Sequence, residues 1–417
     1  MVPDGWENTR LKNIAKIKSG STPLRSKQDL YYSKDGTPWI KTLDLNNSDI
    51  LTTDEKITDL ALQETSCSVF PINTVLVAMY GGFNQIGRTG LIRVPSAINQ
   101  ALSGLVLNEE KAHPRYVLNY LNGNVKQWKK FAASSRKDPN ITREDVCSFE
   151  ILLPPLPEQR KIAKILSTWD KAISTTERLI DNSKQQKKAL MQQLLTGAHT
   201  QRKRLLDDSG KPFEGEWEEV KLGKLGTTFT SLTGKTKSDF GSGKLYVPYI
   251  NIFKNASVDI NYLERVNISE NERQNEVKFG DIFFTTSSET PEEVGMSSVM
   301  LDMPNEAVYL NSFCFGFRLH SFEQATPIFM KHVLRSSSVR RSISILAQGA
   351  TRYNLSKTQL LKVEIPLPKK AEQQKIASVL NNADKEIKLL KQQLADLKQE
   401  KKALMQQLLT GKRRVKV

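Results

Sequence analysis

The sequence predicts a tandem α/β (α+β) fold in which two mixed blocks alternate with two long helices. Three observations predict it. The stretch KKALMQQLLTG occurs at 187–197 and again at 401–411, which is 214 positions later. Around it, residues 150–197 match residues 364–411 without a gap, with 26 identities in 48 positions. Weaker similarity continues through the preceding blocks, so the whole chain is an internal repeat.

The weaker similarity sets the domain boundaries. GWENTRL (5–11) resembles EWEEVKL (216–222), and INTVLV (72–77) resembles FGDIFF (279–284), at offsets of 211 and 207. A few loop insertions therefore separate the two halves. We predict five segments: a first block at 1–150, a helical region at 151–197, a polar linker at 198–213, a second block at 214–364 and a second helical region at 365–417.

Each block is predicted to mix short strands with helices. Runs rich in β-branched and aromatic residues, such as TVLVAMY (74–80) and FCFGFRL (313–319), are bounded by Gly, Asn, Ser and Pro. Residues 114–132 and 327–345 read as helices. Blocks of this composition indicate compact domains of mixed secondary structure.

The matched segments are predicted to be helices of about 40 residues, each roughly 60 Å long. Their apolar residues recur at alternating steps of four and three, as in a coiled coil. Gly197 and Gly411 stand where each helix would end. The predicted seam consists of Ile162, Leu166, Trp169, Ile173, Ile180, Leu190 and Leu194 in the first copy, and Ile376, Leu380, Ile387, Leu390, Leu394, Leu397, Leu404 and Leu408 in the second.

An apolar stripe of that length needs a partner, and the nearest candidate is the other copy. An antiparallel pairing would relate the halves by an approximate, pseudo-twofold axis. The alternative is that each helix lies separately on the surface of its own block. Lys187 and Lys401 occupy matched seam positions, where they either meet another subunit or extend their ammonium groups to solvent.

Charge and composition narrow the function. The chain has 61 Lys and Arg against 45 Asp and Glu, a formal charge of +16, which favours a polyanionic partner, nucleic acid first and a membrane surface second. No run of eighteen apolar residues is present, so no spanning helix is expected, and the start MVPDGWENTR does not read as a signal peptide. Three cysteines and four histidines argue against a disulfide framework or metal centre and fit a reducing cytoplasm.

A search for catalytic motifs finds none. LTGKTK (232–237) contains Gly-Lys-Thr, but a phosphate loop requires glycine where Phe229 stands. No glycine-rich dinucleotide or S-adenosylmethionine fingerprint follows a predicted strand, and no nucleophile has a recognisable base. The sequence therefore predicts a protein without catalysis of its own.

The complete pattern resembles the specificity subunit of type I restriction-modification systems. The resemblance covers the whole chain and rests on the helix openings PLPEQRKIA and PKKAEQQKIA, the shared ending KKALMQQLLTG, and the matched pairs Trp6–Leu11 and Trp217–Leu222. It implies that each block is a target-recognition domain reading one half of an asymmetric bipartite site in double-stranded DNA. It also implies an antiparallel coiled coil that sets the spacing between the halves.

The same resemblance implies the partners and their cofactors. Two methyltransferase (modification) subunits would dock and methylate adenine with S-adenosylmethionine, and restriction subunits would add cleavage that requires ATP and Mg²⁺. This chain itself would hold no cofactor and no metal. Three alternatives remain: a methylation-only system, a self-sufficient nuclease or methyltransferase, and a coiled-coil interaction protein or RNA binder whose charge is incidental.

Candidate DNA contacts are polar and basic residues in the predicted loops. Lys and Arg suit phosphates, whereas Arg, Asn and Gln suit base edges. The segment MYGGFNQIGR (79–88) resembles a reading loop most, because its glycines allow close backbone approach; for any single residue the alternative is a structural turn. The candidates are Ser21, Thr22, Arg25, Asn84, Gln85, Arg88, Arg136 and Lys137 in the first block, and Thr233, Lys235, Lys237, Ser287, Thr351, Arg352 and Tyr353 in the second.

Overall fold

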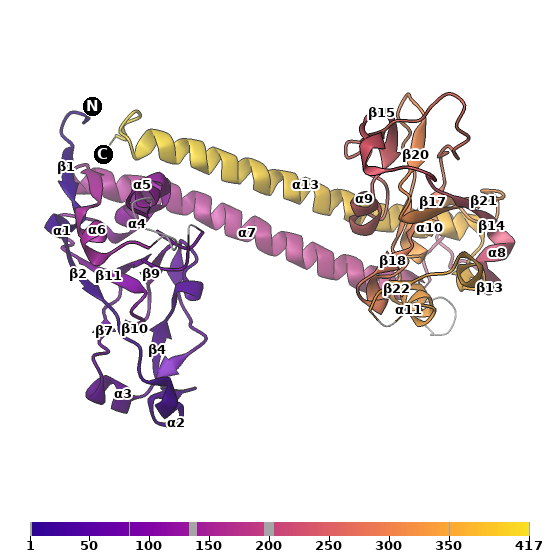
Figure 1. Cartoon of the computed structure of the whole chain (residues 1–417). Helices are drawn as coiled ribbons and strands as arrows, with labels where there is room; N and C mark the ends of the chain where they lie inside the picture. The colour runs from indigo at the N-terminus through magenta and orange to yellow at the C-terminus, as the bar shows by residue number, and fades with distance from the viewer. Residues whose placement is uncertain (1, 83, 133–139, 196–203, 350, 417) are drawn as a thin grey trace. The chain divides into compact units, whose positions relative to one another are not determined.

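The computed structural model describes residues 2–82, 84–132, 140–195, 204–349 and 351–416. The chain forms two compact units (Figure 1). Unit 1 comprises Met1–Glu177 and Gln392–Val417, and unit 2 comprises Arg178–Lys391. Each unit therefore contains one block, the beginning of the long helix that follows that block and the end of the other long helix.

Unit 1 is built on two five-stranded sheets with short helices around them. The first has the order β2-β11-β8-β9-β5 and the second β3-β6-β4-β10-β7. The strands are β1 (Glu7–Arg10), β2 (Ala15–Ser19), β3 (Tyr32–Ser33), β4 (Thr37–Ile40), β5 (Asp49–Ile50), β6 (Lys56–Ile57), β7 (Val69–Phe70), β8 (Val75–Ala78), β9 (Thr89–Ile92), β10 (Ser96–Ile98), β11 (Leu102–Leu107) and β12 (Glu150–Leu153). The helices are α1 (Leu11–Ile14), α2 (Gln28–Tyr31), α3 (Asp59–Glu64), α4 (Pro114–Gly123), α5 (Val125–Ala132) and α6 (Arg143–Ser148).

Unit 2 repeats this plan with fewer strands. Its sheets have the orders β14-β21-β17-β19 and β16-β15-β20, with a small ribbon β18-β22. The strands are β13 (Glu218–Lys221), β14 (Gly226–Thr230), β15 (Phe240–Val247), β16 (Glu264–Val266), β17 (Ile282–Thr285), β18 (Ser287–Ser288), β19 (Ser297–Val299), β20 (Val308–Leu310), β21 (Cys314–Leu319), β22 (Tyr353–Asn354) and β23 (Glu364–Leu367). The helices are α8 (Leu222–Leu225), α9 (Tyr249–Lys254), α10 (Pro327–Val333), α11 (Ser337–Ile345) and α12 (Lys357–Leu360).

The two units pair equivalent strands in the same way, so the sequence repeat is also a structural repeat. In unit 1, β1 pairs with β12, the strand directly before the long helix; in unit 2, β13 pairs with β23 in the same way. The parallel pair β4–β10 has its counterpart in β15–β20. The order β2-β11-β8-β9 likewise corresponds to β14-β21-β17-β19. The predicted fold of two tandem mixed α/β copies is therefore confirmed.

Two long helices follow the blocks. Helix α7 (Leu156–Leu195) has 40 residues and α13 (Lys370–Leu408) has 39. Both are rich in Lys, Gln, Ala and Leu, which favour helix, and Glu158 and Glu372 stand in the first turns, where a negative charge suits the helix dipole. Both helices lie inside the predicted segments 151–197 and 365–417, because the first residues of each segment are taken by β12 or the end of β23.

Polar contacts define how the helices pair within each unit. In unit 1, Lys401 Nζ lies 2.5 Å from Asp170 Oδ1, and Lys398 Nζ lies 2.7 Å from Glu177 Oε1. As the residue number rises along α7, the partner's number falls along α13, so the pairing is antiparallel.

Unit 2 has the equivalent contacts. Lys187 Nζ lies 2.5 Å from Asp384 Oδ1, and Ser183 donates a hydrogen bond to Glu386 over 2.9 Å. The 214-residue repeat converts Lys187–Asp384 into Lys401–Asp170 with the helices exchanged. Each of the matched lysines is therefore paired with a carboxylate of the other long helix and does not extend freely into solvent.

The predicted seam positions are all buried or half-buried, but the ends of the stripe pack into the block cores. Ile162, Leu166 and Leu408 belong to the main core of unit 1, together with the fully buried Trp128 and Phe149. Leu194, Ile376 and Leu380 belong to the corresponding core of unit 2. The remaining positions lie along the helices: Ile180 is buried, and Trp169, Ile173, Leu190, Ile387, Leu390, Leu394, Leu397 and Leu404 are half-buried.

A buried glutamine fixes each block to its helix. Gln159 accepts a hydrogen bond from the His113 amide over 2.8 Å and donates to the carbonyl of Pro154 over 2.8 Å. Gln373 accepts from the Thr326 amide over 2.9 Å and donates to the carbonyl of Pro368 over 2.9 Å. Both glutamine residues are fully buried. The start of each long helix is thus tied in the same way to the loop before α4 or α10.

Candidate nucleic-acid interface

Three segments meet at equivalent places in the two blocks. In unit 1, the Met79 amide donates to Ala101 O over 2.8 Å, and the Ser21 amide donates to Ile98 O over 3.0 Å. These bonds join the strap after β2, the loop after β8 and the turn before β11. We call this surface, formed by residues 20–25, 79–82, 84–88 and 99–101, the loop edge of unit 1.

Unit 2 has the same hydrogen bonds on different residues. The Thr286 amide donates to Phe313 O over 3.0 Å, and the Leu232 amide donates to Leu310 O over 2.9 Å. The loop edge of unit 2 accordingly consists of residues 231–237, 286–295 and 311–313. Because backbone atoms make these bonds, the frame is kept while the side chains on it differ.

The segment before α6 or α12 also returns to each loop edge. The Ile141 amide donates to Met79 O over 2.9 Å, and the Leu355 amide donates to Thr286 O over 2.9 Å. Ile141 and Leu355 are themselves 214 residues apart. The candidates Arg136 and Lys137 lie outside the described residues, although Ile141, a few residues further on, joins the base of the 79–88 loop.

In unit 1, the strap residues are held by side-chain hydrogen bonds. The Ser21 and Ser66 hydroxyls lie 2.8 Å apart, and Thr22 donates to the side chain of Gln100. The Arg25 guanidinium lies 4.4 Å from the centre of the Tyr32 ring and forms a 2.7 Å ion pair with Glu55. Arg25 is nevertheless 48% exposed, so one face of its guanidinium remains open to a ligand.

Glu55 is a charged partner for that arginine. Burial raises the pKa of Glu55, but the hydrogen bonds and charges of Lys41 and Arg25 outweigh burial, so its pKa lies below the usual range. The carboxylate therefore stays ionised at neutral pH. It fixes the direction of Arg25 and reduces the net positive charge of this part of the loop edge.

The 79–88 loop has a rigid base and exposed polar residues. Gly81, Gly82 and Gly87 have positive φ angles of 112°, 77° and 75°. A Cβ atom at Gly87 would lie 2.4 Å from Trp128 Cδ1, so only glycine fits against that core ring. Asn84 is exposed, and Arg88 donates to the Gln85 side chain over 2.6 Å.

In unit 2, four candidates gather at the β18-β22 ribbon. Ser287 pairs with Asn354, and Ser288 pairs with Tyr353. Tyr249 donates from its hydroxyl to Ser287 O over 3.0 Å. Thr351 and Arg352, which directly precede β22, are exposed. The ribbon therefore brings Ser287, Thr351, Arg352 and Tyr353 together, although they are distant in sequence.

The other candidates in unit 2 lie on the strap. Lys235 Nζ forms a 2.5 Å ion pair with Glu272, and its side chain is only 6% exposed. The Thr233 amide donates a hydrogen bond to Gln274 Oε1 over 3.1 Å. Lys237 is exposed in a short 3-10 turn at Lys237–Asp239. Lys237 is thus the strap lysine that is open to a ligand, whereas Lys235 is engaged in the fold.

Sequence reasoning missed two exposed aromatic residues on these edges. Tyr80 is 44% exposed and Phe313 is 62% exposed. Tyr80 stands inside the predicted reading loop, so its position was an available signal. Phe313 could be found only through the register of the repeat, since it precedes a strand that otherwise reads as core. Aromatic rings at such places can stack on bases.

The described residues offer hydrogen-bond donors, cations and rings at the loop edges, and no metal centre. No group of three or more His, Cys, Asp or Glu side chains within the described ranges could hold a metal ion. Likewise, no helix in that part of the chain is both long and apolar enough to span a membrane.

Comparison with known proteins gives consistent results. The family model described as type I restriction modification DNA specificity domain matches residues 3–183 and 214–399. The type I restriction enzyme MjaVIII specificity subunit of Methanocaldococcus jannaschii is 25% identical over 449 residues, which covers 100% of this chain and 94% of that protein.

Two solved structures resemble the fold. A chain from a study of complex assembly and conformational transition of the type I R-M system superposes with a TM-score of 0.61 at 18% identity, covering 98% of each chain. The type I restriction-modification system S subunit from M. genitalium gives 0.57 at 15% identity, covering 98% of this chain and 96% of that one. At these identities the likeness concerns the fold.

Proposed function

We propose a function from one premise: this chain belongs to the type I restriction-modification DNA specificity family, whose model matches both of its halves. Its relatives are specificity subunits, which recognise DNA and do not catalyse. The chain is accordingly the DNA-recognition subunit of a type I restriction-modification complex. DNA and other subunits of that complex are its partners.

In more detail, each loop edge reads one half of a bipartite target. The observation that carries this proposal is the repeated frame: equivalent backbone hydrogen bonds present different side chains in units 1 and 2. Asn84, Gln85 and Arg88 face the DNA in unit 1, whereas Ser287, Arg352 and Lys237 do so in unit 2. Because the equivalent backbone frames of the two units present different side chains, the two half-sites should differ in base sequence.

The long helices set the distance between the half-sites. Two sites carried on one scaffold gain from effective concentration, so each edge can bind modestly by itself. Two methyltransferase subunits dock on this chain and methylate adenine, one in each half-site. S-adenosylmethionine is bound by those subunits, and ATP and Mg²⁺ are used by restriction subunits where the system includes them.

The first experiment maps adenine methylation by long-read sequencing in a host that carries this chain with its modification subunit. The control host lacks only this chain. We expect one asymmetric motif, two short halves around a fixed gap, to be methylated only when the chain is present. Unchanged methylation despite a detectable modification subunit would reject the proposal.

Two variants test its parts. Exchange of residues 1–150 for another recognition block should change one half-site and leave the other intact. Insertion of seven residues after Glu177 and seven after Lys391 lengthens both helices by about 10 Å, so the gap should grow by about three base pairs at 3.4 Å each. A change in both halves after the block exchange would contradict the modular reading.

A further inference from the structure

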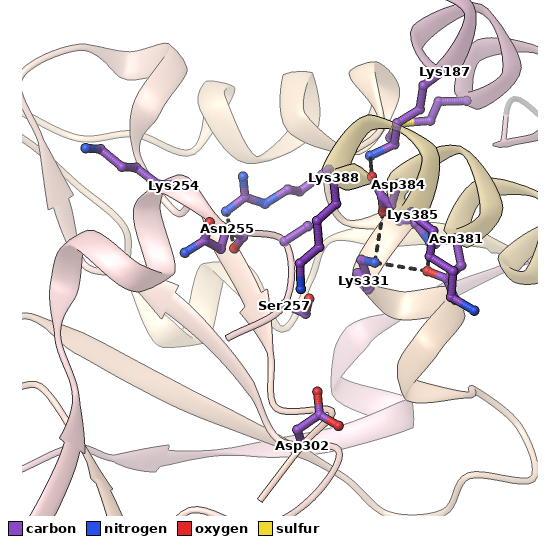
Figure 2. A pocket seen from close by; sticks show the side chains of 14 residues that line it. Lys187, Lys254, Asn255, Ser257, Asp302, Lys331, Asn381, Asp384, Lys385 and Lys388 are labelled. Atoms are coloured by element: carbon purple, nitrogen blue, oxygen red, sulfur yellow. Dashed lines mark hydrogen bonds and ion pairs between the residues drawn. The ribbon is translucent and has the colours of Figure 1, made fainter. Parts of the chain in front are cut away.

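A basic pocket in unit 2 is not used by the loop edges. It has a volume of about 720 Å³ and lies where the end of α7, the start of α13, α9 and α10 come together (Figure 2). Lysines approach it from all four helices: Lys187, Lys254, Lys331, Lys385 and Lys388.

Only two of these lysines are neutralised. Lys187 and Lys331 share the carboxylate of Asp384, at 2.5 and 2.9 Å. Lys331 also donates to Asn381 Oδ1 over 2.9 Å. Two ammonium groups on one carboxylate leave one positive charge uncompensated at the centre of the pocket.

The other three lysines are exposed and unpaired. Within the described residues, no carboxylate lies at ion-pair distance from Lys254, Lys385 or Lys388. Figure 2 shows the Lys388 side chain extending from α13 toward Ser257, whereas Asp302, the second acid of the lining, lies apart at the far wall. Five lysines and two acids leave a clear positive excess.

Hydrogen bonds from Arg335 hold one wall of the pocket. Arg335 donates to the carbonyls of Ser297 and Ile252 over 2.7 Å each and to that of Asn255 over 2.9 Å. These bonds fix the segment after α9, which carries Asn255 and Ser257 into the lining. A preformed pocket with fixed walls binds a ligand at a lower cost in conformational entropy than a flexible one.

Unit 1 keeps lysines at the positions equivalent to Lys187 and Lys385, namely Lys401 and Lys171, but lacks part of the remaining charge. The hydrogen bonds from His113 to Gln159 and from Thr326 to Gln373 align α4 with α10. Neutral residues then replace the charged or basic ones of unit 2: Leu118 for Lys331, Asn119 for His332, Asn122 for Arg335 and Ser174 for Lys388. The scaffold therefore does not require a cation at 331, 335 or 388, and the added positive charge of unit 2 at these positions points to a ligand.

We propose that this pocket binds a phosphate group through the ammonium groups of Lys388, Lys385 and Lys254 and the hydroxyl of Ser257. A phosphate matches both the positive excess and the hydrogen-bond donors of the lining. Its source is either the DNA backbone or a free phosphate or nucleotide. The DNA source rests on the proposed function, whereas the affinity of the pocket for phosphate does not.

The test compares two charge-matched variants of the full chain. The pocket variant is Lys254→Gln/Lys385→Gln/Lys388→Gln. The control variant, Lys171→Gln/Lys188→Gln/Lys402→Gln, removes three exposed lysines of α7 and α13 outside the pocket, and Lys171 is the repeat equivalent of Lys385. All six side chains are exposed, so both variants should fold.

Two measurements identify the source of the phosphate. Calorimetric titration of the full chain with inorganic phosphate and with ATP detects a free anion, and we expect at least tenfold weaker binding in the pocket variant than in the control. Anisotropy of the assembled complex on target duplex between 50 and 200 mM salt detects a DNA phosphate. The slope of log K against log salt is negative, and loss of one phosphate contact makes it shallower by about 0.9.

The outcomes separate clearly. A shallower salt slope in the pocket variant than in the control variant assigns the pocket to the DNA backbone. Loss of phosphate or ATP binding with an unchanged slope assigns the pocket to a free anion. If both the salt slope and the binding of phosphate and ATP are the same in the two variants, the proposal is overturned. Weaker assembly of the pocket variant with a modification subunit would not rescue it, because the pocket would then bind an acidic protein surface. If wild-type complex shows no sequence preference, the proposed function fails while the titration still tests the pocket.

A gain-of-affinity variant guards against misfolding as an explanation. Asp302→Asn removes the acid that repels an anion, so phosphate is expected to bind several-fold more tightly. Weaker binding by this variant would contradict the assigned position of the anion.

Discussion

Replacement of Arg204 by alanine is expected to destabilise unit 2 by about 2 kcal/mol. The Glu372 side chain, in the first turn of α13, is only 2% exposed. Its carboxylate accepts hydrogen bonds from Arg204 Nε over 3.0 Å and from Trp217 Nε1 over 3.1 Å, and it pairs with a second guanidinium nitrogen of Arg204. The substitution removes the Arg204 guanidinium. Of these hydrogen bonds, the buried Glu372 carboxylate then keeps only the one from the Trp217 indole.

The magnitude follows from burial. Removing one partner of a fully buried ion pair costs about 3–5 kcal/mol, because the other charge is left without compensation. The Arg204 side chain is 29% exposed, so water can enter the space that it leaves and the cost is reduced to about 2 kcal/mol. That free energy corresponds to a roughly 30-fold increase in the equilibrium constant for opening.

Hydrogen exchange measured by mass spectrometry is the appropriate assay, because peptides from unit 1 serve as an internal reference. Arg204→Ala should speed exchange in α10, β23 and the start of α13, and leave β8 and β11 unchanged. The repeat provides the matched control: Arg414 pairs with Glu158 over 2.8 Å in unit 1, so Arg414→Ala should affect unit 1 and spare unit 2.

A double substitution separates the buried charge from lost packing. Glu372→Gln keeps the shape of the side chain and removes its charge, so Arg204→Ala/Glu372→Gln should exchange more slowly than Arg204→Ala alone. Equal exchange in the single and double variants would refute the reasoning, as would an effect of Arg204→Ala spread evenly over both units.

Three further results are expected. Asp170→Lys or Lys401→Asp alone should lower the free energy of unfolding by about 1 kcal/mol, and the double variant that exchanges the two charges should recover most of that loss. The corresponding charge exchange in unit 2 should not recover stability, because a lysine at 384 would face Lys331. Burial, and then the charge of Lys331, lower the pKa of His332 to about 4, so the unfolded chain takes up a proton below pH 6.5 while the folded chain does not. Stability should therefore fall by about 2 kcal/mol from pH 7 to pH 5, and urea unfolding of His332→Asn should lack that loss. Gly87→Ala forces a positive φ on a Cβ-bearing residue against a core ring, so it should lower stability by about 3 kcal/mol and weaken only the half-site read by unit 1; unchanged thermal unfolding would contradict the packing described.

The sequence alone predicted the frame because the frame repeats. Apolar spacing and a constant offset identified both helices to within a few residues, and the composition of the blocks identified their mixed fold. The buried ion pairs were not predictable, since a glutamate is expected on the surface unless its partner is known. Arg204 lies 168 positions from Glu372 in the chain, and no local pattern joins them. The matched EQ dipeptides at 158–159 and 372–373 were the available signal.

The candidate interface was predictable in part for a related reason. Loop composition indicated Asn84, Gln85 and Arg352, because glycine and polar residues mark exposed turns. It could not separate the open Lys237 from the engaged Lys235, because that distinction depends on Glu272, which lies in another loop. Contacts between distant segments decide such cases, and a single sequence does not contain them.

The divergence of the blocks beside nearly identical helices has a structural cause. Backbone atoms carry the hydrogen bonds that hold each loop edge, such as Ile141 to Met79 and Leu355 to Thr286, and backbone bonds tolerate any side chain that does not disturb the core. The helices, in contrast, are held through side chains such as Gln159 and Gln373, whose identity must be kept. Apart from positions such as Gly87 that touch the core, residues on the loop edges are therefore free to change while the scaffold is not. It follows that transfer of the loop segments alone, without the rest of the block, should be sufficient to transfer recognition of a half-site.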